Sequence, residues 1–183
     1  MISEQNFAGT AGATFSDDRL HRLVLWRRWS DARPLGFLML NPSSAGVEDD
    51  PTIRRCVGFA RREDAGGIVV CNLSPMVATD PRELYAAIAF ENVPRAFPDG
   101  HDQIRTQALA PCSVVVAAWG AFAGASRIGS ATLAREAARA AGCLFEARGQ
   151  ALRCLGTTAD GWPRHPLYLP ADAPLVPWEP RHG

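Results

Sequence analysis

Short, continuous runs of apolar residues recur along the chain and predict buried β-strands. The clearest runs span residues 36–40, 68–72 and 113–119. Runs of this length without alternating polar positions are typical of strands that are covered on both faces. Weaker patterns predict further strands at residues 20–29, 143–147 and 151–155. Several short buried strands indicate a globular protein built around a β-sheet.

Helical spacing predicts helices between these strands. Asp50 and Asp80 are each followed by proline, and such pairs suit the cap and the first residue of a helix. After Asp50, apolar residues repeat at i, i+3, i+4 and i+7, namely at Ile53, Cys56, Val57 and Ala60. A shorter helix is predicted at residues 101–109, and an alanine-rich helix from a cap at Ser130 to Ala141.

The alternation of strands and helices predicts the α/β fold class. A buried strand, a helix and a second buried strand form a βαβ unit, which requires parallel strands and a right-handed crossover. We therefore expect a three-layer αβα sandwich around a mostly parallel central sheet, in a single domain over residues 1–183. Residues 1–16 are small and polar and predict a loose lead-in, whereas residues 157–183, with six prolines, predict an irregular end.

The charge balance limits the kinds of partner. The chain has 19 basic and 19 acidic side chains, whereas proteins that coat nucleic acid without sequence preference usually carry a basic excess. A local basic strip remains open, because one predicted helix carries Arg54, Arg55, Arg61 and Arg62. A solvated helix face is the alternative interpretation of the same residues.

No targeting or membrane segment is visible in the sequence. No apolar run approaches the roughly 20 residues that a membrane-spanning helix requires. The first residues also lack a basic segment that leads into an apolar core, as a secretory signal would. We therefore expect a cytoplasmic protein without membrane contact.

The cysteines favour reduced, buried thiols. There are five of them, none in a C-x-x-C pair: Cys56, Cys71, Cys112, Cys143 and Cys154. A disulfide framework or a structural zinc site would show paired spacing. The chain also lacks the glycine-rich motifs of P-loop and dinucleotide enzymes and the G-x-S-x-G motif of α/β-hydrolases. We therefore expect no cofactor.

Polar residues follow three of the predicted buried strands. The first strand leads into Asn41, Pro42, Ser43 and Ser44, the second into Asn72 and Leu73, and the third into Trp119 and Gly120. Ligands of open parallel sheets bind outside the carboxyl ends of the strands. An asparagine there offers a donor pair and an acceptor on one planar amide, which suits the edge of a nucleobase or an amide-like substrate. The alternative is that each asparagine only ties down its own loop.

His165 is the histidine best suited to act as a general acid or as an electrostatic group. Its usual pKa lies near physiological pH, and Pro166 stiffens its loop. A purely structural role is the alternative. Arg164 precedes it and, with Arg54 and Arg55, is a candidate contact for DNA phosphates.

An acidic cluster lies beside the first of these loops. Glu48, Asp49 and Asp50 could hold a divalent cation, because hard cations prefer carboxylate oxygens. The alternative, which we favour, is that Asp50 caps the helix and that its neighbours lie favourably near the helix N-terminus. We therefore predict no metal ligands here.

Five segments together resemble a bacterial and phage family known as domain of unknown function 1643. They are Leu-Asn-Pro-Ser-Ser-Ala from Leu40, Asp-Pro-Thr-Ile-Arg-Arg-Cys from Asp50, Val-Cys-Asn-Leu from Val70, Ala-Trp-Gly from Ala118 and His-Pro-Leu-Tyr-Leu from His165. The resemblance runs from about residue 20 to residue 178. It implies no activity by itself.

The order of the motifs also resembles the uracil-DNA glycosylase superfamily, more distantly. This resemblance implies that Asn41 positions the attacking water, that Asn72 reads the base and that His165 stabilises the departing base. It also implies a uracil-DNA glycosylase-like fold. The chain departs from the superfamily pattern in three respects. No acidic residue occupies the first motif, His165 lies farther beyond the last predicted strand than is usual, and no aromatic residue of the Asn41 loop is placed to stack on a base.

Three functions follow as hypotheses. The first is an N-glycosidase that acts on a damaged or modified nucleobase in DNA or in a nucleotide. The second is a non-catalytic module that binds a base or nucleotide in the same pocket, motivated by the missing carboxylate and the neutral charge. The third is a metal-dependent hydrolase that uses the acidic cluster. The expected partners are therefore a nucleobase, a nucleotide or DNA.

Overall fold

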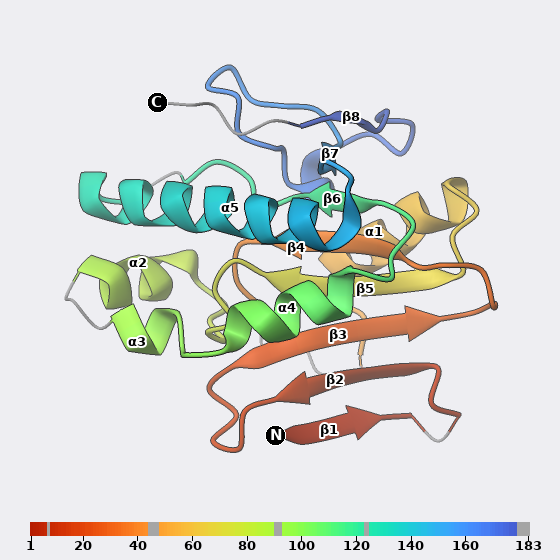
Figure 1. Ribbon diagram of the computed structural model, residues 1–183, viewed down its shortest axis with the longest axis horizontal. Helices are drawn as coiled ribbons and strands as arrows, with labels where there is room; N and C mark the ends of the chain where they lie inside the picture. The colour runs from red at the N-terminus through yellow and green to blue at the C-terminus, as the bar shows by residue number, and fades with distance from the viewer. Residues whose placement is uncertain (7, 44–47, 90–92, 123–124, 179–183) are drawn as a thin grey trace.

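The computed structural model describes residues 1–6, 8–43, 48–89, 93–122 and 125–178, which form a mixed sheet with helices against it (Figure 1). The strands are β1 (Ile2–Gln5), β2 (Ala11–Phe15), β3 (Arg22–Arg28), β4 (Leu35–Met39), β5 (Gly67–Asn72), β6 (Val115–Ala117), β7 (Arg153–Cys154) and β8 (Val176–Pro177). The helices are α1 (Pro51–Arg62), α2 (Pro81–Ala89), α3 (Val93–Ala96), α4 (His101–Leu109), α5 (Arg127–Arg148) and the 3₁₀ helix η1 (Pro166–Tyr168). The predicted α/β class is confirmed.

The sheet is mixed, so the prediction of a mostly parallel sheet is wrong. Its described strands lie in the order β1-β2-β3-β5-β4-β6-β7-β8. Pairings among β5, β4, β6 and β7 are parallel, whereas the other four described pairings are antiparallel. The predicted βαβ unit is present as β4, α1 and β5, because its two strands pair in parallel. The error lies in the outer strands.

Residues 1–16 form β1 and β2 and are not a loose lead-in. Gly12 of β2 lies opposite Trp26 of β3, and a side-chain carbon added to this glycine would be only 2.3 Å from the indole ring. The small residues therefore let Trp26 pack against β2, and their low hydrophobicity concealed the strand. Ala13 and Phe15 are buried on β2. Antiparallel neighbours need only short turns, so these strands pair with β3 in chain order.

Helices cover both faces of the central strands. All residues of β4 are buried, and successive side chains point to opposite faces. Leu38 packs in a cluster that includes residues of α2, α4 and α5, whereas Phe37 and Met39 pack with residues of α1. Figure 1 shows α4 and α5 on the near side of the sheet and α1 behind it. The helix predicted after Asp50 is confirmed as α1, with Asp50 as its N-cap.

Helix α5 replaces the strand predicted at residues 143–147. It begins after an N-cap at Ser126, not at Ser130, and continues past Ala141 to Gly149, which ends it with a left-handed φ of 66°. A short apolar run fits a buried helix as well as a strand, so the pattern alone was ambiguous. None of the described helices, α5 included, is long and apolar enough to cross a membrane.

The proline-rich segment after β7 is mostly irregular, but η1 and β8 lie within it. Two arginines of α1 hold part of it in place. Arg55 donates to the carbonyl of Leu169, and Arg62 donates to the carbonyls of Ala171 and Ala173 at 2.8 and 2.7 Å. This attachment holds η1 against α1 and so places the loop that precedes η1 beside the ends of the central strands.

Candidate functional site

A cavity of about 500 Å³ opens where the central strands end. Its walls come from the residues after β4 and β6, from the end of β5, from the start of α1 and from the loop before η1. Residues predicted from the sequence make up much of the wall, namely Asn41, Ser43, Asn72, Trp119, Gly120, Arg164 and His165. The three predicted strand ends and the late histidine therefore meet in one pocket, as the carboxyl edge of parallel strands requires.

Two of the described residues predicted to contact the substrate are not part of this wall. Pro42 and Leu73 are buried without lining the cavity. Leu73 packs in the hydrophobic cluster beneath α4 and α5, because the side chain after Asn72 points to the other face of the sheet. Ser44 lies outside the described residues.

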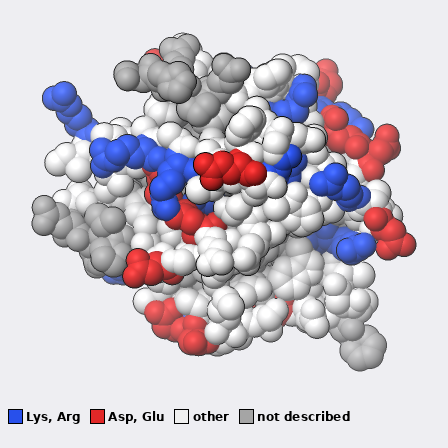
Figure 2. All heavy atoms as spheres, in the orientation of Figure 1, with Lys and Arg blue, Asp and Glu red and all other residues white. Residues whose placement is uncertain are grey.

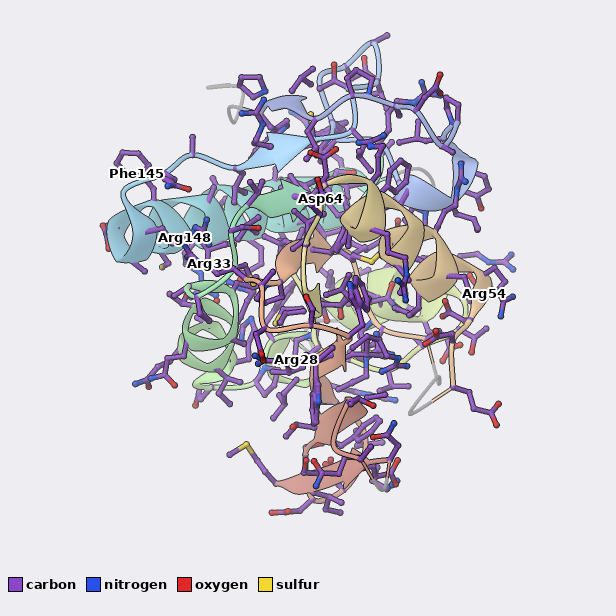
Figure 3. All side chains as sticks on the ribbon, turned by 90° about the vertical axis from the view of Figure 1, so that its right-hand side faces the viewer. Arg28, Arg33, Arg54, Asp64, Phe145 and Arg148 are labelled. Carbon is purple, nitrogen blue, oxygen red and sulfur yellow. The ribbon has the colours of Figure 1, made fainter. Side chains whose placement is uncertain are left out.

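The arginines of α1 do not form a free basic strip. Arg55 is used to hold the C-terminal segment, and the guanidinium of Arg61 stacks 4.5 Å from the centre of the Trp29 ring. Arg54 projects from α1 on the outside of the molecule (Figure 3). On the opposite face, which carries α4 and α5, basic and acidic side chains are interspersed (Figure 2). Of the three predicted DNA contacts, Arg164 alone lines the pocket, where it is exposed.

Asn41 ties down its loop and also lines the cavity. Its Nδ2 donates to the carbonyl of Ala78 at 2.7 Å and to that of Pro42 at 3.3 Å. The amide hydrogens thus tie the loop after β4 to the loop after β5. Its side chain also lines the cavity, and its amide oxygen makes no hydrogen bond with the described residues. Asn41 can therefore offer an acceptor to a ligand or a water molecule.

Asn72 differs, because its amide is buried without a protein partner. The residue is 4 % exposed, and neither Nδ2 nor Oδ1 has a hydrogen bond with the described residues. Trp119 is similar, since its Nε1–H is buried and unpaired while its ring packs edge-on against Trp178, with centroids 4.8 Å apart. Both residues line the cavity. Asn72 and Trp119 together therefore contribute two buried, unpaired donor groups and one buried, unpaired acceptor.

Asp50 brings a carboxylate into the pocket, although the sequence analysis favoured it as a helix cap and otherwise considered it as a metal ligand. Its Oδ1 accepts the backbone N–H of Ile53 at 2.7 Å, as a cap does, and its Oδ2 accepts the Ser43 hydroxyl at 2.9 Å. Asp50 also lines the same cavity as Asn41. The start of α1 thus places a carboxylate in the wall of the cavity that Asn41 lines. The separation of Asp50 from Asn41 along the chain concealed this placement.

Arg22, at the start of β3, is a charged wall residue that the sequence pattern did not reveal. It is 4 % exposed and lines the cavity. Burial lowers the pKa of the guanidinium to about 10, against an opposing effect of the Asp50 carboxylate. The group is still charged at neutral pH, so the pocket contains a buried cation near a carboxylate.

Two tyrosines supply aromatic surface from distant parts of the chain. Tyr85 of α2 is largely buried in the wall, and burial raises the pKa of its phenol. Tyr168 of η1 also lines the cavity and is 78 % exposed. Its ring centroid lies 5.7 Å from that of His165. The helix η1 thus brings an exposed aromatic ring to the cavity, which the Asn41 loop does not.

His165 presents a neutral imidazole to the pocket. Leu167 N–H donates to its Nδ1 at 3.3 Å. A ring nitrogen that accepts a hydrogen bond carries no proton, so the neutral ring holds its proton on Nε2. Burial lowers the pKa of the ring, with a smaller opposing effect of Asp50. His165 therefore supplies an N–H donor. His165 also lies close to Gly120, because a side-chain carbon added to this glycine would be 3.5 Å from the Cβ of His165.

The acidic cluster does not gather into a metal site. Glu48 is exposed, Asp49 forms an ion pair with Arg27 at 2.7 Å, and Asp50 caps α1. Within the described ranges, three ligand atoms lie within 4.8 Å of one another at a different place, among His101, Asp102 and Glu136. Asp49 and Asp50 thus make separate contacts with the protein at the start of α1.

The cysteines are free thiols, as predicted. All are buried except Cys143, which is half-buried. Burial raises the pKa of Cys71 to about 12 and that of Cys112 to about 11. Thiols with such pKa values are poor nucleophiles at neutral pH. None of the cysteines lines the cavity, so the pocket chemistry rests on nitrogen and oxygen groups.

Comparisons with known proteins assign a family but not a reaction. No curated protein and no solved structure matches the chain. The distant resemblance to uracil-DNA glycosylases gains no support from these comparisons. One family model matches residues 22–167, a range that contains every pocket residue predicted from the sequence. The chain therefore belongs to the family described as protein of unknown function, DUF1643.

Proposed function

We propose that the pocket recognises the polar edge of a nucleobase and hydrolyses the bond between that base and its sugar, in a nucleotide or in DNA. The observation that carries the proposal is the Asn72 amide, whose polar atoms are buried and unpaired in the wall of an open cavity. A buried polar group without a partner costs about 1–3 kcal/mol. A ligand that supplies the missing partners recovers that free energy on binding.

The unpaired groups suit a base more than an apolar ligand. The Asn72 amide offers a donor and an acceptor in one plane, and base edges present donors and acceptors in the same way. Trp119 adds a further donor, which calls for an acceptor on the ligand. The cavity, about 500 Å³, lies within the usual range for small-molecule sites. Tyr168 at the rim offers a ring against which the base can stack.

The remaining groups support hydrolysis. Asp50 takes a proton from a water molecule that the Asn41 amide oxygen holds in place, and the water oxygen bonds to the sugar C1′. The bond from C1′ to the base nitrogen breaks, and its electron pair leaves with the base. His165 Nε2–H donates a hydrogen bond to the base as negative charge develops on it. The proton taken up by Asp50 finally passes to the released base.

The order of these groups along the chain supports a catalyst over a binding-only module. A first-motif residue, a base-reading asparagine and a late histidine follow one another as in the uracil-DNA glycosylase superfamily, and we propose a related fold. The binding-only hypothesis was motivated by a missing carboxylate and by the neutral net charge. Asp50 answers the first of these, because its carboxylate lies in the pocket wall.

The proposal is tested by measuring base release. Purified protein is incubated with single- and double-stranded oligonucleotides that carry uracil or oxidised pyrimidines, and with the matching nucleotides, and free base is quantified by chromatography. We expect release from at least one substrate. A parallel thermal-shift series with the same compounds detects binding. Binding without release identifies the non-catalytic module, whereas neither binding nor release contradicts the proposal.

The titration of His165 provides a test that needs no substrate. Its pKa in the folded protein is lowered from the usual 6.5, mainly by burial. Between the lowered value and 6.5 the unfolded chain binds more protons than the folded one, so stability is lost as the pH falls through this window. We expect the free energy of unfolding to drop less on acidification in His165→Gln than in the wild type. NMR of the ring should give a midpoint below 6.5, and a midpoint above 6.5 would refute the assignment of a neutral donor.

A further inference from the structure

A partly buried ion-pair network lies between the start of α4 and the middle of α5. Arg105 of α4 is its centre and is only 2 % exposed. One of its nitrogens, Nη2, binds Asp102 and lies 3.5 Å from Glu136 of α5. Arg139 binds both of these carboxylates as well. His101 lies against the same carboxylates, with Nε2 at 3.5 and 3.6 Å from them.

The network does not have the character of a metal site, although three of its atoms are close enough to hold an ion. Two carboxylates face two guanidinium groups, so their charges already balance. A dication bound there would lie next to the positive charge of Arg105, which is buried and therefore not screened by water. The carboxylates are better explained as the groups that hold Arg105 in place. Burial lowers the pKa of Arg105, and Glu136 is the largest opposing influence.

The other terminal nitrogen of the Arg105 guanidinium group contacts the backbone behind the pocket wall. This nitrogen, Nη1, donates to the backbone carbonyls of Asn72 and Leu73, at 3.3 and 3.1 Å. These carbonyls belong to the end of β5, and the side chain of Asn72 lines the cavity. The N–H of Leu73 donates to the carbonyl of Met39, which lies on the neighbouring strand β4, at 2.8 Å. The backbone beneath the Asn72 amide is thus held by β4 from one side and by Arg105 from another.

This contact matters because the Asn72 amide has no hydrogen bond of its own with the described protein. An amide that donates and accepts within the protein is oriented by those bonds. The Asn72 amide is oriented instead by its rotamer and by the position of its Cα. A shift of the β5 end therefore passes directly to the amide.

We propose that Arg105 is a positioning residue, which sets the place of the Asn72 amide in the pocket, and that Asp102 and Glu136 serve to hold Arg105. The inference deepens the proposed function and rests on it where base recognition is concerned. The positional part stands on the contacts of the β5 end alone. The experiment separates the two.

The test compares Arg105→Lys with a matched control, Arg148→Lys. Arg148 also donates to backbone carbonyls, those of Leu109 and Cys112, at 2.9 and 2.8 Å. It lies near the end of α5, on the side of the view opposite Arg54 at the start of α1 (Figure 3). Both variants should lower the melting temperature. The side-chain amide signals of Asn72 in ¹H–¹⁵N NMR should move in Arg105→Lys and stay in place in Arg148→Lys.

Uracil binding, measured by titration, then links position to recognition. We expect Arg105→Lys to weaken it about tenfold, which is within the range of coupling between contacting residues. In the Asn72→Ala background, the same substitution should cost less than about twofold, because the amide that it positions is gone. Equal losses in both backgrounds, or unmoved Asn72 signals in folded Arg105→Lys, would overturn the inference.

Two outcomes need a second measurement. If Arg105→Lys does not fold, Glu136→Gln replaces it, since this variant keeps Arg105 and removes one of its carboxylate partners. We expect smaller Asn72 shifts in the same direction, and no shift would count against the inference. If the wild type does not bind uracil, uracil recognition fails as a function, while the NMR comparison still decides whether Arg105 positions Asn72.

Discussion

Asp50→Asn is expected to lower the rate of base release by about 10²- to 10⁴-fold, the usual contribution of a positioned general base. The substitution removes the charge that draws a proton from water. It leaves an oxygen that can still accept the Ile53 N–H, and asparagine caps helices about as well as aspartate. We expect the free energy of unfolding to fall by only about 1 kcal/mol, from the lost charge at the helix N-terminus. Single-turnover assays and chemical denaturation measure the two effects.

Asp50→Ala is the matched comparison for this prediction. It removes the charge and the cap together, so it should lose the same activity and about 1 kcal/mol more stability than Asp50→Asn. If Asp50→Asn retains full activity, Asp50 is only a helix cap and the water must be activated by another group. If both variants lose activity in proportion to unfolded protein, the carboxylate has a structural role alone.

Asn72→Leu is expected to abolish recognition of the base without destabilising the protein. Leucine has nearly the shape of asparagine and no polar atoms, so it removes a buried amide that has no protein partner. The free energy of unfolding should stay constant or rise by up to about 2 kcal/mol, since the cost of the unpaired groups disappears. Base binding should weaken by at least about 100-fold, because a site that reads polar groups discriminates strongly when its own are lost.

Asn41→Leu is the control for this substitution. The Asn41 amide donates to the carbonyl of Ala78 at 2.7 Å, so the same change there should destabilise the protein by about 1–3 kcal/mol. Thermal denaturation of the two variants side by side measures the contrast. A large loss of stability in Asn72→Leu would mean that its amide is satisfied within the folded protein, and the base-reading role would lose its support.

Much of the site could be predicted from local pattern. Asn41, Asn72 and Trp119 each follow or end an apolar run, and the carboxyl ends of parallel strands meet at one edge of a sheet. His165 was added to this predicted site because of the resemblance to the glycosylase superfamily. The parallel strands β4 and β5 were predictable for the same reason, because the apolar spacing of α1 requires a crossover between them.

Other parts depend on contacts between segments that lie far apart in the chain. The strand β2 was not predicted, because its small residues are explained only by the packing of Trp26, which lies on another strand. Arg22 and Tyr168 reach the pocket from β3 and η1, and no local pattern marks them as wall residues. Arg105 looks like a helix residue in sequence and becomes a support of β5 only when α4 packs against the sheet.

The two asparagines show where the division lies. The sequence by itself determined that a polar amide follows each of two buried strands, because a run of apolar residues and its end are local features. Only the tertiary structure decided that one amide is bound and the other is not. The carbonyl of Ala78 accepts a hydrogen bond from Asn41, while no described group makes a hydrogen bond with the Asn72 amide. Whether a polar group is satisfied depends on what other segments bring to it, and that is settled by packing.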